Sequence, residues 1–224
     1  MRHLISTSLM ALSISAVALL LSATAKADSP PFYFELNIKQ QRIPMVGNSQ
    51  LESNSFGLRY QENLTENVGV NMALGRQSLD HQNNANALGF SPSGHHAGLG
   101  LTANTAEKYR FQAGIDISYH YFDNNQYLNG ERVKISWNQA EARLWLAIQL
   151  SPQFKAYGCA FAISLDGKQK VSSTTTVVTQ LDNKDKTGQC GGLSWQTEDH
   201  GFIGIEANGG AMRGGRIYFG RWFD

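Results

Sequence analysis

A run of alternating apolar and polar residues limits the possible folds of this chain more than any other feature. In the segment from Arg110 to Phe122, one face would carry Phe111, Ala113, Ile115, Ile117, Tyr119 and Tyr121. Polar, charged or glycine residues occupy most of the positions between them. Because successive side chains on a β-strand point to opposite faces, this period of two indicates a strand with one apolar face. A helix would scatter the same apolar residues around its circumference.

The alternation recurs along the chain and predicts an all-β, antiparallel up-and-down transmembrane barrel of about ten strands, with eight as the alternative. The other apolar sets lie in Phe32–Ile38, Phe56–Tyr60, Val68–Leu74, Ala97–Ala103, Ala142–Leu150, Tyr157–Leu165, Leu193–Trp195, Ile203–Ala207 and Ile217–Phe223. The segment from Arg132 to Leu150 is long for one crossing, and its apolar phase shifts between Trp137 and Ala142. We interpret the shift as a β-bulge, with the earlier part above the membrane.

The links between these strands alternate in length. Links after even strands are short, at 62–66, 105–108, 151–153 and 198–201. Most links after odd strands are longer and rich in Asn, Ser and Gly, at 44–53, 80–94, 123–131 and 166–189. Short periplasmic turns and long outer loops are typical of outer-membrane barrels. The run of Ser, Thr and Val at 172–179 predicts a hairpin that extends above the membrane.

The N-terminus has the pattern of a secretory signal peptide. Arg2 and His3 precede an apolar stretch from Leu4 to Ala23, and Ala25-Lys26-Ala27 follows. A basic start, an apolar core and small residues at the cleavage site predict a signal peptide at 1–27 and a barrel domain at 28–224. An N-terminal transmembrane anchor is the alternative. Cleavage would remove two cations and leave a near-neutral chain without a basic run, which argues against nucleic-acid partners.

The composition of the second face of the strands indicates whether the barrel lies in a membrane or in water. It combines many glycines with charged residues. Glycine on the outside of a soluble barrel would weaken the strands without a gain, whereas inside a narrow barrel it makes room for long side chains. We therefore expect the apolar face to meet lipid. A soluble barrel or sandwich is the alternative. Aromatics near strand ends would form interfacial girdles, at Phe32, Tyr60, Tyr109, Tyr121, Trp195 and Trp222.

From Pro30 to Asp224 the chain resembles the small outer-membrane β-barrel proteins of Gram-negative bacteria. Its last strand, Ile217–Asp224, is similar to the aromatic C-terminal strand of that class, although Asp224 follows the terminal Phe. The resemblance implies Sec-type export, a place in the outer membrane, contact with lipid and lipopolysaccharide, and insertion by the barrel-assembly machinery. It implies nothing about oligomeric state.

Charged residues on the glycine-rich face predict a lumen charge network. Its members are Glu35, Lys39, Arg59, Arg110, Asp116, Arg143 and Glu206. Charges inside a barrel have to pair or hold water. Two interpretations follow: an ion-pair plug that rigidifies the barrel, or a small polar conduit.

The sequence contains only weak candidates for catalysis. Ser93, His81, His95 and His96 flank one outer loop, where a Ser–His pair could act as a nucleophile or the histidines could bind zinc or copper. Their spacing matches neither pattern, nor the paired acidic motif of omptins, nor the His-x-Ser-Asn pattern of lipid A deacylases. We therefore expect solvated loop residues and predict no catalytic residue, metal or cofactor. Cys159 and Cys190 permit one disulfide, but Cys159 also fits an outward apolar position beside Phe161, which favours two free, inert cysteines.

These features predict a non-enzymatic, porin-like barrel with a structural, surface-contact or narrow-channel role. One alternative is an outer-membrane enzyme that modifies lipid or peptide at the outer leaflet. The other is a soluble periplasmic β-barrel that binds a small ligand.

Overall fold

The fold was taken from a computed structural model, which describes residues 32–47, 49–83, 89–105, 110–197 and 200–223. The expected signal peptide at 1–27 and Tyr109 lie outside the described residues, so both stay predictions.

Every regular element of the described chain is a β-strand, and consecutive partners in the sheet run antiparallel. The strands are β1 (Phe32–Pro44), β2 (Gln50–Asn63), β3 (Val68–Gln82), β4 (Ser93–Asn104), β5 (Phe111–Leu128), β6 (Glu131–Gln149), β7 (Phe154–Ser172), β8 (Thr176–Asp182), β9 (Thr187–Gln196), β10 (Gly201–Gly210) and β11 (Arg213–Phe223). In the described residues, no helix is long and apolar enough to cross a membrane.

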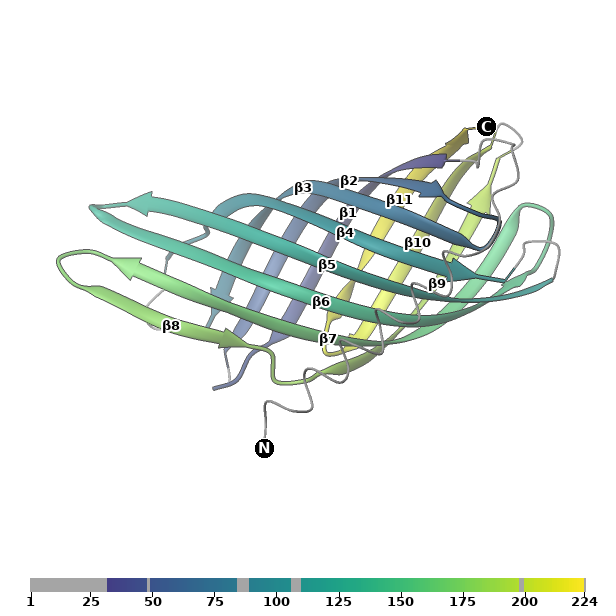
Figure 1. Ribbon diagram of the computed structural model, residues 1–224. Helices are drawn as coiled ribbons and strands as arrows, with labels where there is room; N and C mark the ends of the chain where they lie inside the picture. Colours follow the sequence, from purple (N-terminus) through teal and green to yellow (C-terminus); the bar gives the residue numbers. More distant parts are fainter. Residues whose placement is uncertain (1–31, 48, 84–88, 106–109, 198–199, 224) are drawn as a thin grey trace.

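Ten of these strands close into a barrel, which confirms the predicted fold class (Figure 1). β1 pairs with β11 from Phe32 opposite Phe223, and β6 pairs with β7, so the ring has no free edge between its first and last strands. β8 is not part of the ring. It pairs with the outer half of β7, and these strands form the predicted hairpin above the barrel. Closure matters because lipid offers no water to satisfy an open sheet edge.

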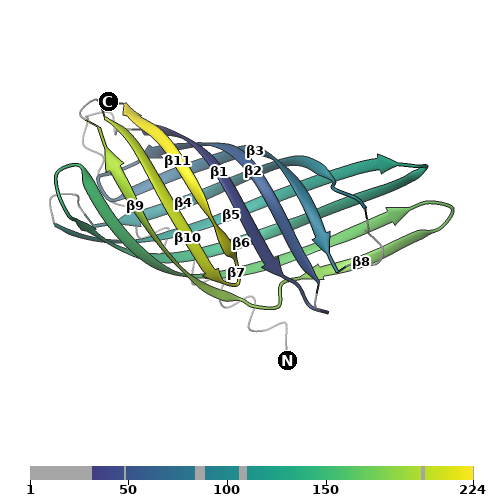
Figure 2. The same cartoon turned by 180° about the vertical axis from the view of Figure 1, so that it is seen from behind.

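The two ends of the barrel differ in height. The hairpins β5–β6 and β7–β8 project far beyond the other strands at one end, whereas the chain's C-terminus lies at the opposite end (Figures 1 and 2). The strands β2, β4, β6 and β9 all finish at this second end. We call the two ends the hairpin end and the terminal end.

The outer wall carries a continuous apolar band next to the terminal end. Its exposed side chains include Phe34, Leu36, Ile38, Phe56, Leu58, Met72, Leu74, Leu99, Phe111, Ile115, Ile117, Tyr119, Leu144, Leu146, Leu193, Trp195, Ile203, Ile205, Ile217 and Phe219. On β5, Phe111 is 67% exposed, whereas Asp116, next to the exposed Ile115, lines the lumen. This is the sidedness expected of a barrel that faces lipid rather than water. Among the expected girdle residues that the structure describes, Trp222 is the exception, because it points into the lumen.

The predicted bulge in the Arg132–Leu150 segment is wrong. β6 keeps one register with β5 from Phe111 opposite Ile148 to Leu128 opposite Glu131, and its register with β7 is equally unbroken. What changes near Trp137 is the environment. Toward the terminal end the outer face is apolar, whereas toward the hairpin end the inner face is apolar, and Val133, Ile135 and Trp137 are buried there.

The hairpin end of the lumen is therefore filled by an apolar core. It consists of Ile43, Met45, Leu51, Leu79, Phe90, Phe122, Val133, Ile135, Trp137, Phe161, Ile163, Leu165, Leu181, Ala211 and Met212. The rings of Phe122 and Trp137 stack with centroids 4.3 Å apart. Phe161, Ile163 and Leu165 belong to this core, and Tyr157 faces the lumen nearer the terminal end, so the expectation that this set faces outward is wrong for β7.

Contacts across the lumen hold this core together. The side chains of His81 on β3 and Gln169 on β7 form a hydrogen bond of 2.6 Å. A bridge between Met45 and Asn183 joins the end of β1 to the segment after β8. Directly below the core, Cys159 on β7 and Cys190 on β9 are joined by a disulfide and pack against the apolar cluster.

Inward-facing glycines provide the room for large side chains in this narrow lumen. A Cβ atom added to Gly204 would lie 2.2 Å from Cζ of Tyr218, and one added to Gly98 would lie 2.1 Å from Nδ1 of His120. Rings from neighbouring strands likewise cover Gly75, Gly114, Gly188 and Gly192. The glycines therefore make room for rings as well as for charges.

Candidate functional site

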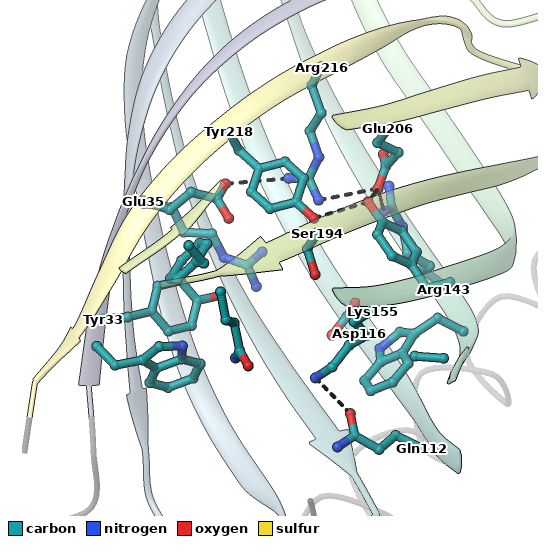
Figure 3. Close-up of a pocket in the computed structure, with 17 residues that line it drawn as sticks. Tyr33, Glu35, Gln112, Asp116, Arg143, Lys155, Ser194, Glu206, Arg216 and Tyr218 are labelled. Carbon is teal, nitrogen blue, oxygen red and sulfur yellow. Dashed lines mark hydrogen bonds and ion pairs between the residues drawn. The ribbon is translucent and has the colours of Figure 1, made fainter. Parts of the chain in front are cut away.

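The terminal half of the lumen contains a cavity of about 230 Å³ that is lined by both charged and aromatic side chains (Figure 3). Its lining comes from β1, β2, β5, β6, β7, β9, β10 and β11, because every strand places alternate residues inside the ring. The apolar core lies above it, toward the hairpin end.

A chain of alternating positive and negative side chains forms the upper wall of the cavity, toward the hairpin end. Arg216 donates to Glu35 at 3.4 Å and to Glu206 at 3.2 Å. Arg143 donates to the same Glu206 oxygen at 3.0 Å and to Glu141 at 2.9 Å. Figure 3 shows the Glu35–Arg216–Glu206 part of this chain. Because the carboxylates and guanidinium groups alternate, each buried charge has an opposite charge beside it, which offsets the cost of removing it from water.

Tyrosines complete the network. Tyr157 on β7 donates a hydrogen bond of 2.9 Å to Glu206, and Tyr218 lies 3.5 Å from the Tyr157 hydroxyl. The Arg216 guanidinium also lies 4.7 Å from the Tyr218 ring centroid, within range of a cation–π contact. Glu206 thereby receives hydrogen bonds from three strands, β6, β7 and β11.

The lower wall, toward the terminal end, contains Arg59 and Asp116, whose hydrogen bonds are to polar rather than charged side chains. Nη2 of Arg59 donates to Oε1 of Gln61 at 3.0 Å, and Nε of Arg59 is buried without a hydrogen-bond partner. Thr102 donates to Asp116 at 2.5 Å. On the same side of the cavity, Lys155 donates to Gln112 at 3.0 Å (Figure 3).

The structure places six of the seven expected network residues inside the barrel, but it does not join them into one cluster. Glu35, Arg143 and Glu206 belong to the ion-pair chain, whereas Arg59 and Asp116 line the lower wall. Lys39 faces the lumen above the cavity lining.

Arg110 lies outside the network. It is exposed just before β5 begins, because that strand starts at Phe111.

Two members of the ion-pair chain, Glu141 and Arg216, are absent from the expected set. Arg216 alternates with the outward Ile217 and could have been found from that pattern. Glu141 was hidden by the bulge interpretation, which broke the alternation of β6 just before it.

The Ser and His candidates do not form one site. Ser93 and His95 face outward on β4, whereas His96 faces inward and packs against Phe122. His81 is buried in the lumen near the hairpin end. His96 pairs with Gly75, and His81 lies six residues further along β3, roughly 20 Å away at the rise of a strand. Among the described residues, no group of three His, Cys, Asp or Glu side chains could hold a metal ion.

The described strands form a closed antiparallel ring. Its outer wall carries an apolar band, its lumen contains buried charges, and its strands are joined by short turns at the terminal end. The chain has the architecture of a small outer-membrane β-barrel. This agrees with the class that the sequence resembles, and it places the apolar band in lipid.

Comparisons with known proteins give the following matches. No protein-family model matches the chain, and no curated protein sequence matches it. Similar solved structures include an outer-membrane channel from Pseudomonas putida F1, with 11% identity, a TM-score of 0.49, and coverage of 90% of this chain and 100% of that chain. The translocator domain of the autotransporter NalP from Neisseria meningitidis has 10% identity, a TM-score of 0.49, and coverage of 96% and 95%. The attachment invasion locus protein Ail of Yersinia pestis has 13% identity, a TM-score of 0.39, and coverage of 88% and 100%.

Proposed function

We propose that the protein is a closed, non-conducting barrel of the outer membrane that presents an extended β-sheet above the outer leaflet for surface contact. The apolar core at the hairpin end carries this proposal. Its buried residues come from β1, β2 and β3 on one side of the ring and from β5, β6 and β7 on the other. A hydrated ion would lose its water in such a region and would meet mainly apolar side chains with a few buried amides, such as Gln139 and Gln169, so the core weighs against the narrow-channel alternative.

The sheet above the barrel supports the contact role. The outer parts of β5, β6 and β7 continue with β8 as a four-stranded extension (Figure 1). Its outer face is polar, and Lys134 pairs with Asp123 there at 3.0 Å. Large apolar side chains are nevertheless exposed near the hairpin tips, at Tyr127, Val177 and Val178. Exposed apolar groups on an otherwise polar extension are suited to contact with another surface.

Lipid contact follows from the same arrangement. Arg76 and His95 are register partners on the outer wall, where the apolar band ends toward the hairpin side. The Arg76 guanidinium at this height would meet the phosphates of lipopolysaccharide. Export through a signal peptide cleaved after Ala27 and insertion by the barrel-assembly machinery remain part of the proposal.

Planar-bilayer recording tests the closed state. We expect the wild-type barrel to give no current steps. The double variant Phe122→Gly/Trp137→Gly removes the stacked pair from the core and should conduct, whereas Phe111→Gly/Trp195→Gly removes two lipid-facing rings and should not. Heat-modifiable gel mobility would show that each variant is folded. Stable conductance steps from the wild-type barrel would contradict the proposal.

Attachment of expressing cells to polystyrene tests the contact role. The triple variant Tyr127→Ser/Val177→Ser/Val178→Ser should reduce attachment several-fold. The variant Lys168→Ser/Lys170→Ser alters exposed polar residues of the same extension and should attach like the wild type. Equal attachment by the triple variant and the wild type would remove the contact role and leave the closed state untouched.

A further inference from the structure

The lumen cavity is a pocket with one accessible side. Its lining includes the first or last inward-facing residues of several strands at the terminal end, namely Tyr33, Gln112, Lys155, Gln196, Phe202 and Trp222. At the other side it ends below the apolar core. A solute could therefore enter from the terminal end, which faces the periplasm in the topology derived above, but could not continue through the barrel.

Arg59 brings to this pocket a guanidinium with few direct hydrogen bonds, although the Glu35 and Asp116 carboxylates of the same lining lie near enough to interact with its charge. Among the described residues its guanidinium makes one hydrogen bond, to Gln61, and no carboxylate forms an ion pair with it. Gln61 also accepts a hydrogen bond of 2.9 Å from Tyr33, so the amide holds both side chains in place. A planar guanidinium that is fixed on one side and has donors to spare is suited to a carboxylate, which it can bind through two parallel hydrogen bonds.

Aromatic rings form the apolar part of the pocket. At the mouth, the Tyr33 ring lies 4.5 Å from the Trp222 ring and 5.5 Å from the Phe202 ring, in edge-to-face geometry. Trp145 lines the pocket from β6, which lies on the opposite side of the ten-strand ring from β1. Flat apolar surfaces on two sides favour a flat apolar ligand.

We propose that this pocket binds a small aromatic carboxylate from the periplasmic side, with the carboxylate on Arg59 and the ring between Trp145 and the aromatic cluster at the mouth. The volume of about 230 Å³ is below the ~300–1,000 Å³ of pockets for drug-sized ligands, which restricts the ligand to about one ring. The site is independent of the contact role proposed above, because it lies at the other end of the barrel.

Isothermal titration of the purified barrel in a non-ionic detergent tests this site. The probes are benzoate and benzamide, which share a ring but differ in charge. We expect the wild type to bind benzoate at least tenfold more tightly than benzamide. Arg59→Gln should weaken benzoate binding at least tenfold and leave benzamide binding unchanged. Arg221→Gln, at an exposed arginine on the outer wall of β11, makes the same chemical change outside the lumen and should bind like the wild type.

A blocking variant separates binding in the lumen from binding in the detergent layer. Ser194 lines the pocket from β9, and Ser194→Phe should abolish binding of both probes while gel mobility reports a folded barrel. The proposal would be overturned if the folded wild type failed to bind benzoate, if both probes bound equally, or if Arg59→Gln or Ser194→Phe bound benzoate like the wild type.

Discussion

Arg143 of β6 and Glu206 of β10 meet across the lumen at 3.0 Å, although β7 and β9 stand between their strands in the wall. The same carboxylate accepts hydrogen bonds from Arg216 and Tyr157. One side chain thus connects four strands of the ring, and it does so below the apolar core. The lumen is held by polar contacts in its terminal half and by apolar packing in its hairpin half.

Loss of this carboxylate should destabilise the barrel. Glu206→Gln leaves two buried guanidinium groups with one charged partner fewer each, and removing one partner of a buried ion pair costs about 3 kcal/mol. Urea unfolding in detergent, followed by tryptophan fluorescence, would measure the change in unfolding free energy. Asp80→Asn, at an exposed position on the outer wall, should change it by less than ~0.5 kcal/mol. Equal stability of the two variants would show that the ion-pair chain adds nothing.

The apolar core should be equally sensitive. Trp137 is 1% exposed and stacks on Phe122, and removal of a buried tryptophan side chain costs about 3–5 kcal/mol. Trp137→Ala should therefore lower the urea midpoint strongly. Tyr127→Ala, at a ring 72% exposed on the hairpin β5–β6, should leave the midpoint within error. A tolerant Trp137 would indicate that the hairpin end is hydrated rather than packed.

Two glycines on the neighbouring strands β10 and β9 test how tightly the inner and outer faces of the wall are packed. A methyl group at Gly204 would overlap the Tyr218 ring, whereas one at Gly191 would meet only the Tyr157 carbonyl oxygen at 3.7 Å. We expect Gly204→Ala to cost about 1–3 kcal/mol through overpacking. Gly191→Ala should be neutral or slightly stabilising, because alanine lowers the entropy of the unfolded chain. Unfolding curves of the two variants, measured together, would contradict this if their order were reversed.

The disulfide should stabilise the barrel through the unfolded state. Cys159 and Cys190 are 31 residues apart in sequence, and a crosslink that closes a loop of this size contributes up to about 3–4 kcal/mol in the chain-entropy model. Cys159→Ala/Cys190→Ala should fold into the same barrel with a lower urea midpoint. Mass analysis of the wild type after alkylation would show two unmodified cysteines. Alkylation of both without prior reduction would contradict the crosslink.

The sequence predicted the lipid-facing band well, for a physical reason. In that part of the chain only one face of each strand is apolar, so Phe111, Ile115 and Tyr119 could be assigned to the outside from alternation alone. The same rule placed Glu35, Asp116 and Arg143 in the lumen. The short links have room only for a turn, so they predicted that consecutive strands run antiparallel.

The rule failed where the surroundings of the strands change from lipid to water. Above the apolar band the inner face becomes the apolar one. The rule also failed on β7 beside the band, because Tyr157 and Phe161 face the lumen there and small Ala and Gly residues face outward. On β6 both environments occur along one strand, and the change of phase was misinterpreted as a bulge. Which rings and charges meet across the lumen depends on the tilt and closure of the ring, which a one-dimensional pattern does not contain.

The accessibility of spin labels along β6 tests most directly whether the apolar face changes from the outer to the inner side without a bulge. Nitroxide labels would be placed singly from 132 to 148, and collisions with oxygen and with a water-soluble nickel chelate would be measured in lipid vesicles. Even positions should be oxygen-accessible from 140 to 148 and nickel-accessible from 132 to 138, while odd positions stay protected throughout. A switch of the protected set from odd to even positions near 138 would reveal a bulge and contradict the account.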